Sequence, residues 1–258
     1  MKKRIVSIIV IIGLFSGLGV YLDRVYSVPV LMYHNIACGQ KQSRLDVNPK
    51  SFERQMRFLK EQGYNVLALG DYLQMIKEGK KPQKKSVVIT FDDGYRNNYS
   101  DAYPILKKYK IPATIFVVTN WVGKDKMMDW QMIQKAQQSG LIEIGSHTLS
   151  HATLPELNKE NIILEIKESK FILESKLNTS IRFISYPCGF FNAFIKETVK
   201  QAGYLGACAT TLDKSVALDD IYAIRRIRIS NSADSMFIFW TQVSGYYTFF
   251  KDRRIKKK

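Results

Sequence analysis

The sequence contains little cysteine. Its 258 residues include three cysteines, Cys38, Cys188 and Cys208, and none of them belongs to a C-x-x-C pair. An odd number excludes a framework in which every cysteine is paired, and the missing C-x-x-C pattern argues against a cysteine zinc site. Cys188 and Cys208 can still pair in an oxidising compartment, whereas the apolar run around Cys208 is more typical of a small buried residue.

Motifs for nucleic-acid binding are also missing. The formal net charge is +16, yet the chain has no zinc-finger spacing, no RNP-type aromatic motif and no helix-turn-helix pattern. Part of the charge is concentrated in residues 2–4 and 251–258. A basic body also suits anionic lipid or anionic wall polymers, and many of the lysines are consistent with a solvated surface. We therefore expect no nucleic-acid partner.

One long hydrophobic run stands at the N-terminus. Three basic residues precede an uncharged apolar stretch over residues 5–22. Basic residues before such a stretch keep that end in the cytoplasm, and the stretch is just long enough to span a bilayer. The alternative is the core of a cleaved signal peptide, although no A-x-A site follows. We expect residues 1–27 to be a membrane anchor or signal segment that exports the rest of the chain, either held at the outer face or secreted.

Strand-like and helix-like segments alternate after residue 28, without an internal repeat that would indicate a solenoid. The predicted strands are 28–32, 86–91, 113–118, 142–145, 181–186, 204–209 and 223–229. The predicted helices are 49–62, 71–77, 102–109, 129–139, 159–177, 193–202 and 233–250. This alternation indicates parallel strands joined by right-handed crossovers. We therefore expect one α/β domain over 28–250, a distorted (β/α) barrel with about seven strands, followed by the basic tail 251–258.

Two adjacent carboxylates, Asp92 and Asp93, follow the predicted strand 86–91 directly, within the letters TFDDG. In a continuing strand they would point to opposite faces, but Gly94 allows a turn that brings both to one cavity. Two like charges so close together are costly, and a cation would relieve this by taking one as a ligand and leaving the other as a base. An Asp-Gly turn or a helix cap is the alternative.

Two of the three histidines, His147 and His151, stand four residues apart after the predicted strand 142–145. On a helical turn such positions share a face, so both imidazoles can bind one metal ion. Together with one carboxylate they make a facial set that leaves positions open for water and substrate. Two unrelated surface histidines are the alternative.

The fragments TFDDG and HTLSH resemble the first two motifs of the polysaccharide deacetylases, the NodB-homology domain of carbohydrate esterase family four. Their order and separation fit as well, and the resemblance covers residues 28–244, nearly the whole exported portion. It implies a barrel of NodB-homology type, Asp93, His147 and His151 as metal ligands, and Asp92 as the catalytic base. Such oxygen and nitrogen ligands suit zinc first, with cobalt, nickel or iron as alternatives.

The third family motif, which lines the substrate groove, has its counterpart in Tyr186-Pro187-Cys188-Gly189. This Tyr-Pro-x-Gly pattern resembles the poly-N-acetylglucosamine deacetylases of biofilms. Two positions depart from the family: many members have a base-orienting arginine where Ser185 stands, and an aromatic residue where Cys188 stands. The backbone amide there helps to hold the oxyanion and survives a change of side chain, so Cys188 can keep that role. As a metal ligand, Cys188 would crowd a site with three ligands.

Most family members place a further histidine late in the chain as general acid, but none follows His151. The remaining candidate, His34, resembles an early Met-Tyr-His segment that supplies the acid in the biofilm-type subgroup. Arg226 resembles a basic residue near the end of the domain in that subgroup, where it can pair with Asp92 and orient the base. A locally satisfied His34 and a solvent-facing Arg226 are the alternatives.

The resemblance implies a metal-dependent hydrolase that removes N-acetyl groups from a GlcNAc-containing polysaccharide at the cell surface. Peptidoglycan and chitooligosaccharides are the alternative substrates, and a catalytically silent glycan-binding protein is the alternative class. We expect membrane contact through residues 1–27. The basic tail 251–258, with the aromatic helix before it, can also lie against anionic headgroups.

Overall fold

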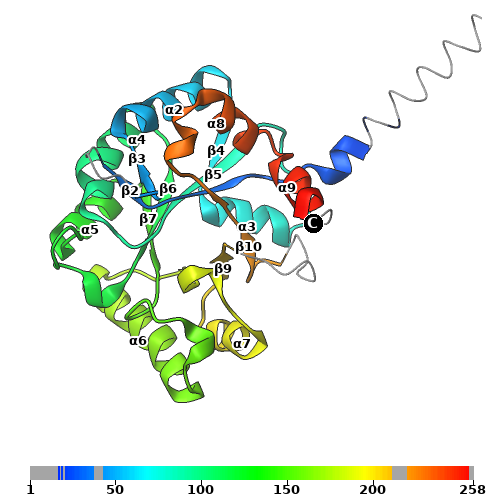
Figure 1. Ribbon diagram of the computed structural model, residues 1–258. Helices are drawn as coiled ribbons and strands as arrows, with labels where there is room; N and C mark the ends of the chain where they lie inside the picture. Colours follow the sequence, from blue (N-terminus) through cyan, green and yellow to red (C-terminus); the bar gives the residue numbers. More distant parts are fainter. Residues whose placement is uncertain (1–16, 18, 20, 38–42, 211–219, 256–258) are drawn as a thin grey trace, which may run out of the picture.

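A nearly closed sheet of parallel strands forms the centre of the molecule (Figure 1). The computed structural model describes residues 17, 19, 21–37, 43–210 and 220–255, with side chains up to residue 251. The main-sheet strands are β1 (Val30–Tyr33), β4 (Asn65–Leu67), β5 (Ser86–Phe91), β6 (Ala113–Val117), β7 (Ile142–Ser146), β8 (Phe183–Ser185), β9 (Gly206–Ala209), β10 (Ile224–Arg225) and β11 (Ile227–Arg228). Their order is β10-β9-β8-β7-β6-β5-β1-β11, and β4 pairs with the first half of β5.

Closure of the sheet depends on one short stretch. β10 pairs with β9 at one end of the strand order and β11 pairs with β1 at the other, yet only Arg226 separates β10 from β11 in the chain. The predicted strand 223–229 therefore bridges the two edges of the sheet, with a break at Arg226. The prediction of an α/β barrel with about seven strands is confirmed.

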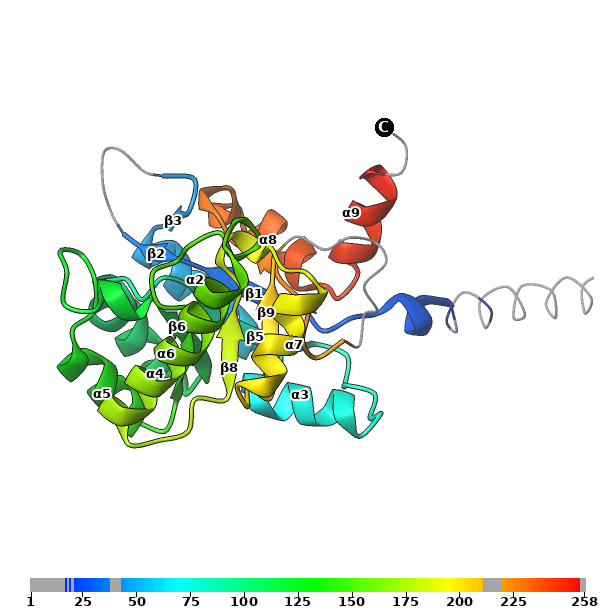
Figure 2. The ribbon, with the colours of Figure 1, turned by 90° about the horizontal axis from the view of Figure 1, so that it is seen from below.

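Helices surround the sheet, as the views of Figures 1 and 2 agree. They are α2 (Pro49–Glu61), α3 (Leu69–Lys77), α4 (Tyr103–Tyr109), α5 (Trp130–Gln138), α6 (Lys159–Leu177), α7 (Ala193–Gln201), α8 (Met236–Val243) and α9 (Tyr247–Ile255). Helix α3 has a distinct place, because its Leu69 and Leu73 pack in a small apolar cluster with inward-facing strand residues such as Val88 and Phe116. It thereby fills the amino end of the barrel.

The alternation along β5 explains where the polar residues go. Val87, Ile89 and Phe91 belong to the large core between strands and outer helices, whereas Val88 belongs to the small inner cluster. Because successive side chains point to opposite faces, the next inward positions after Val88 are Thr90 and Asp92. The barrel interior is therefore apolar at its amino end and polar at its carboxyl end.

Two features differ from the predicted elements. The strands β4, β2 (Asn35–Ile36) and β3 (Asp46–Val47) are short and were not predicted. The predicted helix 233–250 is wrong as a single helix, because the chain breaks between α8 and α9. Gly245 lies at this break with φ of +83°, and a Cβ there would lie 2.1 Å from the Tyr26 ring. The close approach of Tyr26 and the left-handed backbone both require glycine.

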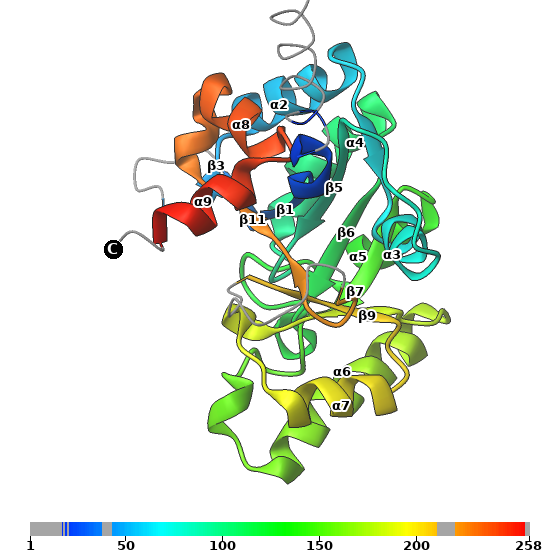
Figure 3. The same cartoon turned by 90° about the vertical axis from the view of Figure 1, so that its right-hand side faces the viewer.

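The N-terminal segment, residues 21–27, lies beside α9 at the amino end of the barrel (Figure 3). Tyr26 and Tyr246 are in edge-to-face contact, and Ser27 N–H donates to the Gly245 carbonyl at 3.0 Å. Among the described residues, no helix has the length and apolar character that crossing a bilayer requires. Most of the apolar run 5–22 lies outside the described residues, so the predicted anchor stays a prediction.

Candidate active site

The two adjacent carboxylates turn toward one cavity at the carboxyl end of β5. Asp93 itself adopts a left-handed backbone with φ of 72°, and Gly94 follows with φ of 76°. The turn thus begins one residue earlier than the glycine that the sequence suggested as its cause. Asp92 and Asp93 are both buried. Burial of two neighbouring carboxylates is unfavourable unless each has its own partner.

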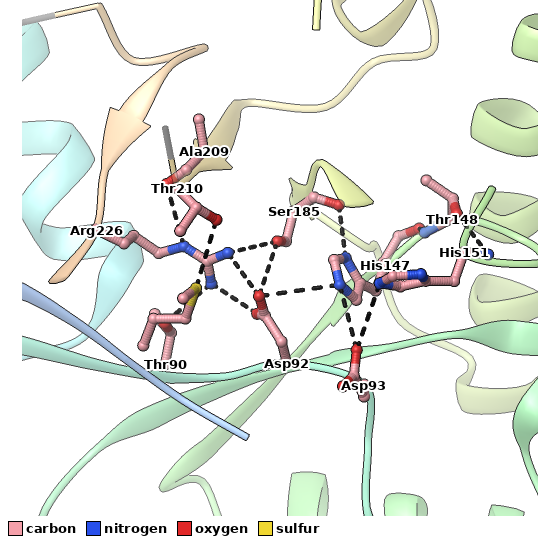
Figure 4. A network of polar contacts seen from close by, with 12 residues as sticks. Thr90, Asp92, Asp93, His147, Thr148, His151, Ser185, Ala209, Thr210 and Arg226 are labelled. Atoms are coloured by element: carbon pink, nitrogen blue, oxygen red, sulfur yellow. Dashed lines mark hydrogen bonds and ion pairs between the residues drawn. The ribbon is translucent and has the colours of Figure 1, made fainter. Parts of the chain in front are cut away.

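Asp92 has its partner in Arg226, the residue between β10 and β11 (Figure 4). The guanidinium donates from Nη1 to Oδ1 and from Nη2 to Oδ2, each at 2.6 Å. Arg226 also donates from Nη2 to Ser185 Oγ at 2.7 Å and from Nη1 to Thr90 Oγ1 at 3.2 Å. This fork holds the Asp92 carboxylate in one orientation.

The surroundings of Asp92 keep it ionised. Its complete burial acts to raise the pKa, but the positive charge of Arg226, the nearby His147 and the hydrogen bonds from Arg226 act in the other direction. The balance holds the pKa of Asp92 well below its usual value. An ionised carboxylate with a fixed direction is suited to accept a proton.

Asp93 faces the two predicted histidines. Its Oδ1 lies 3.5 Å from His147 Nε2 and 3.6 Å from His151 Nε2. The ligand atoms of these three residues lie within 4.8 Å of one another, which suits a single metal ion. Burial and the charge of Asp92 raise the pKa of Asp93 to about 7, an electrostatic stress that a cation would relieve.

The histidines are prepared for metal binding by their other contacts. His147 Nδ1 lies 2.8 Å from the Ser185 carbonyl oxygen, which fixes Nδ1–H as a donor and leaves the Nε2 lone pair directed at Asp93. Burial lowers the pKa of His147 to about 4 and also lowers that of His151, so both rings are neutral, as a metal ligand must be. The His151 ring stacks on Trp121 with centroids 5.3 Å apart. The donor set therefore fits a divalent metal.

The two histidines are carried by a loop, not by the helical turn that their spacing suggested. Thr148 and His151 both have positive φ, 67° and 66°. The loop is held by Glu165 of α6, whose carboxylate accepts hydrogen bonds from the backbone N–H groups of residues 149 and 150, both at 2.9 Å, and from the Ser150 hydroxyl. Glu165 was not identified from the sequence as a functional residue. It could have been recognised as a glutamate one turn after Ile162, on the side of α6 that is buried.

His34 follows β1 and lines a cleft of about 380 Å³ together with Asp92, Asp93, His147 and His151. Burial lowers the pKa of His34, while the charge of Asp92 opposes that shift. Its Nδ1 is buried and has no hydrogen-bond partner among the described residues. The predicted acid, base and metal ligands thus share one cavity.

The Tyr186-Pro187-Cys188 segment divides between cleft wall and core. Cys188 is exposed, lines the cleft and has a left-handed backbone with φ of 56°. The Tyr186 side chain is instead fully buried, with its hydroxyl donating to the Tyr222 carbonyl at 3.0 Å, and Pro187 is buried as well. The structure therefore does not bring the Tyr186 side chain to the cleft, where it had been predicted to contact substrate.

The cysteines do not pair with one another in the described structure. Cys188 and Cys208 are both free thiols, one on the cleft and the other inside the barrel. Burial raises the pKa of the Cys208 thiol to about 12, which suits an inert core residue. Cys38 lies outside the described residues.

Known proteins are similar to this chain in both sequence and fold. The sequence model of the polysaccharide deacetylase family matches residues 79–207. A Bacillus subtilis (strain 168) protein named as a polysaccharide deacetylase is 37% identical over 204 residues, 79% of this chain and 71% of that protein. The poly-beta-1,6-N-acetyl-D-glucosamine N-deacetylase of Staphylococcus aureus (strain MRSA252) is 34% identical over 200 residues, 72% of this chain and 69% of that protein. The solved Streptococcus pyogenes deacetylase PplD, in complex with acetate, is 29% identical, with a TM-score of 0.75 over 82% of this chain and 97% of that one.

The matched segment 79–207 contains β5 with its two carboxylates and the histidine loop after β7. The Asp-His-His cluster and the fixed Asp92 therefore lie within the part of the chain that defines the family. The likeness also extends beyond this segment, since the relatives cover more than two thirds of the chain. On these grounds the chain belongs to the polysaccharide deacetylase family and is an enzyme of that class.

Proposed function

We propose that this deacetylase is metal-dependent and removes N-acetyl groups from poly-N-acetylglucosamine at the cell surface. The observation that carries the metal dependence is the cluster of Asp93, His147 and His151 beside an ionised Asp92 in one cleft. The substrate rests on the 34% identity to a poly-beta-1,6-N-acetyl-D-glucosamine N-deacetylase. Cell-surface location rests on the apolar run that follows the basic N-terminus.

Asp93, His147 and His151 would hold the metal, with zinc as the first candidate and cobalt, nickel or iron as alternatives. A bound divalent cation supplies Lewis-acid polarisation of the acetyl carbonyl and of a water molecule. The other steps are carried by residues of the chain, whose hydrogen bonds and burial support their roles.

Asp92 is the general base. It takes a proton from the water that attacks the amide carbon, and Arg226 holds the carboxylate toward the cleft while it does so. The Cys188 backbone N–H stabilises the negative charge that develops on the carbonyl oxygen. His34 donates a proton to the departing sugar nitrogen; burial lowers its pKa, which makes its protonated form a stronger acid, and the charge of Asp92 opposes that shift. One water is consumed, the C–N bond breaks, and acetate and a free amine leave.

The test is replacement of Asp92 by Asn in the full-length protein. Acetate release from poly-N-acetylglucosamine is expected to fall by roughly 10²- to 10⁴-fold, the usual contribution of a general base. Metal analysis of the same preparation should find the metal retained, because Asp92 is not among the three clustered ligands. Asp125→Asn, at an exposed carboxylate, is the matched control and should keep wild-type activity.

Full activity in a metal-loaded Asp92→Asn protein would contradict the assignment of the base. Metal-free wild-type protein with full activity would contradict metal dependence. Peptidoglycan and chitooligosaccharides belong in the same assay, because faster acetate release from either would replace the proposed substrate. No acetate from any of the three would favour the catalytically silent glycan-binding alternative.

A further inference from the structure

A face of exposed aromatic side chains lies at the amino end of the barrel, away from the catalytic cleft. Phe237, Trp240 and Phe250 are 70%, 49% and 59% exposed. Trp240 and Phe250 line a hollow of about 670 Å³ between α8 and α9, which Tyr64 and Lys85 close on the barrel side. Exposed apolar patches of this kind on a soluble domain indicate an interaction surface.

Basic side chains surround this amino-end aromatic face. Lys85 and Lys251 line the hollow itself. Next to it, the lysine-rich connector 79–85 is tied to the N-terminal segment, since Lys84 pairs with Asp23 at 2.7 Å and Tyr26 donates to the Gln83 carbonyl at 3.4 Å. The lysines of the connector and of residue 251 are exposed. The face therefore offers aromatic groups within a positively charged rim.

Residues 21–27 lie against the same end of the barrel. Tyr21 packs edge-to-face on Phe249 of α9 with centroids 6.0 Å apart. The residues before Tyr21 belong to the apolar run 5–22. Figure 3 shows the N-terminal segment, α8 and α9 gathered at this end. A chain that enters a bilayer here would bring the aromatic and basic side chains to the height of the lipid headgroups.

From these contacts we infer that the amino-end aromatic face docks on an anionic phospholipid surface. Tryptophan and tyrosine favour the membrane interface, and lysines near the surface are attracted to anionic headgroups. A glycan platform fits less well, because Tyr64 and Lys85 precede the first residues of β4 and β5, whereas Asp92 follows the last residue of β5. The six-residue β5 is about 20 Å long, so the face and the base lie at opposite ends of the barrel.

The inference is tested with the full-length protein in nanodiscs whose lipids carry bromine on the acyl chains. Bromine quenches the fluorescence of tryptophans that contact the acyl region, and the chain has three, Trp121, Trp130 and Trp240. In discs containing phosphatidylglycerol, wild-type emission should fall, and Trp240→Phe should remove that fall. Lys85→Gln and Lys251→Gln should each lower the ratio of docked to undocked protein about fivefold.

Matched controls use exposed residues of α6, with Lys167→Gln and Phe171→Ser expected to leave the quenching unchanged. Thermal melting checks that each variant is folded. Equal quenching of wild type and Trp240→Phe would overturn the inference, as would quenching that ignores both lysine variants. A lipid-free change in Trp240 emission on adding N-acetylglucosamine oligomers would assign the face to glycan. A change that depends on protein concentration would assign it to a second copy of the chain.

Discussion

At the scale of single residues, two neighbouring carboxylates have opposite surroundings. Arg226 holds the pKa of Asp92 below its ordinary value, whereas burial beside that charge raises the pKa of Asp93 to about 7. Environments that shift the pKa values of two neighbouring carboxyl groups in opposite directions are typical of catalytic sites. Asp92 is thus kept ionised, the form that can accept a proton, and Asp93 is placed where a cation would favour its ionised form.

The candidate site was only partly predictable from the sequence. Asp92 and Asp93 are adjacent in the chain and His147 and His151 nearly so, so local patterns were sufficient to find them. Arg226 lies 134 positions from Asp92 in the chain. The sequence left open whether it pairs with Asp92 or faces solvent, because the contact depends on how the barrel closes. Glu165 escaped notice because its role is to support backbone N–H groups of a loop, which leaves no motif.

Replacing Arg226 by Met should destabilise the protein strongly. The change leaves Asp92 buried without its partner, and breaking a buried ion pair in this way costs about 3–5 kcal/mol. Arg226→Lys keeps the charge but loses the two-pronged hydrogen bonding, so an intermediate loss is expected. Urea unfolding at neutral pH measures both.

The double variant Asp92→Asn with Arg226→Met separates pairing from packing. Its loss of stability should be smaller than the sum of the two single losses, because neither charge is then left alone. Strictly additive losses would show that the two side chains do not stabilise each other.

At the scale of elements, buried strands were the most predictable features. The predicted strand 86–91 coincides with β5, which is a continuous apolar run. The predicted helix 159–177 coincides with α6, which has Ile162, Ile166 and Leu173 on its buried side. The helix break at Gly245 was missed, since it depends on the Tyr26 ring from the other end of the chain. The three-residue β4 is too short to show a pattern and is stabilised by pairing with β5.

Gly145 in β7 is expected to tolerate no side chain. A Cβ there would lie 2.5 Å from Phe116 Cδ1 and 3.1 Å from the Phe183 carbonyl oxygen. Gly145→Ala should therefore cost about 1–3 kcal/mol of stability, the usual range for overpacking. The measurement is the urea midpoint. Adding Phe116→Leu, which removes the ring, should recover part of the loss, and no recovery would show that the ring is not the cause.

At the scale of the whole molecule, the proposed metal would link two separate parts of the fold. Asp93 follows β5, and the histidines follow β7, two strands further along the sheet. A ligand that binds only the folded arrangement stabilises it by mass action. The same ion would therefore support catalysis and also stabilise the folded barrel.

Removing metal should lower the melting temperature. At a free metal concentration 100 times the dissociation constant the stabilisation is about 2.7 kcal/mol, which for a chain of this size is roughly 5–10 °C. Calorimetry with and without a chelator measures the shift. Asp93→Ala should abolish it. His34→Ala should keep it, because His34 shares the cleft but not the ligand cluster, and its loss there would mean that the ligand set is wrong.

Because the stretch from β10 to β11 closes the sheet, the active site is expected to be complete only when the barrel has folded. The stretch that joins the two edges of the sheet also carries the guanidinium that directs the base. A nascent or truncated chain that stops short of residue 226 has its carboxylates and histidines already synthesised, yet lacks the cation that orients Asp92. Such a chain is expected to hydrolyse no substrate until Arg226 is present and β11 has paired with β1.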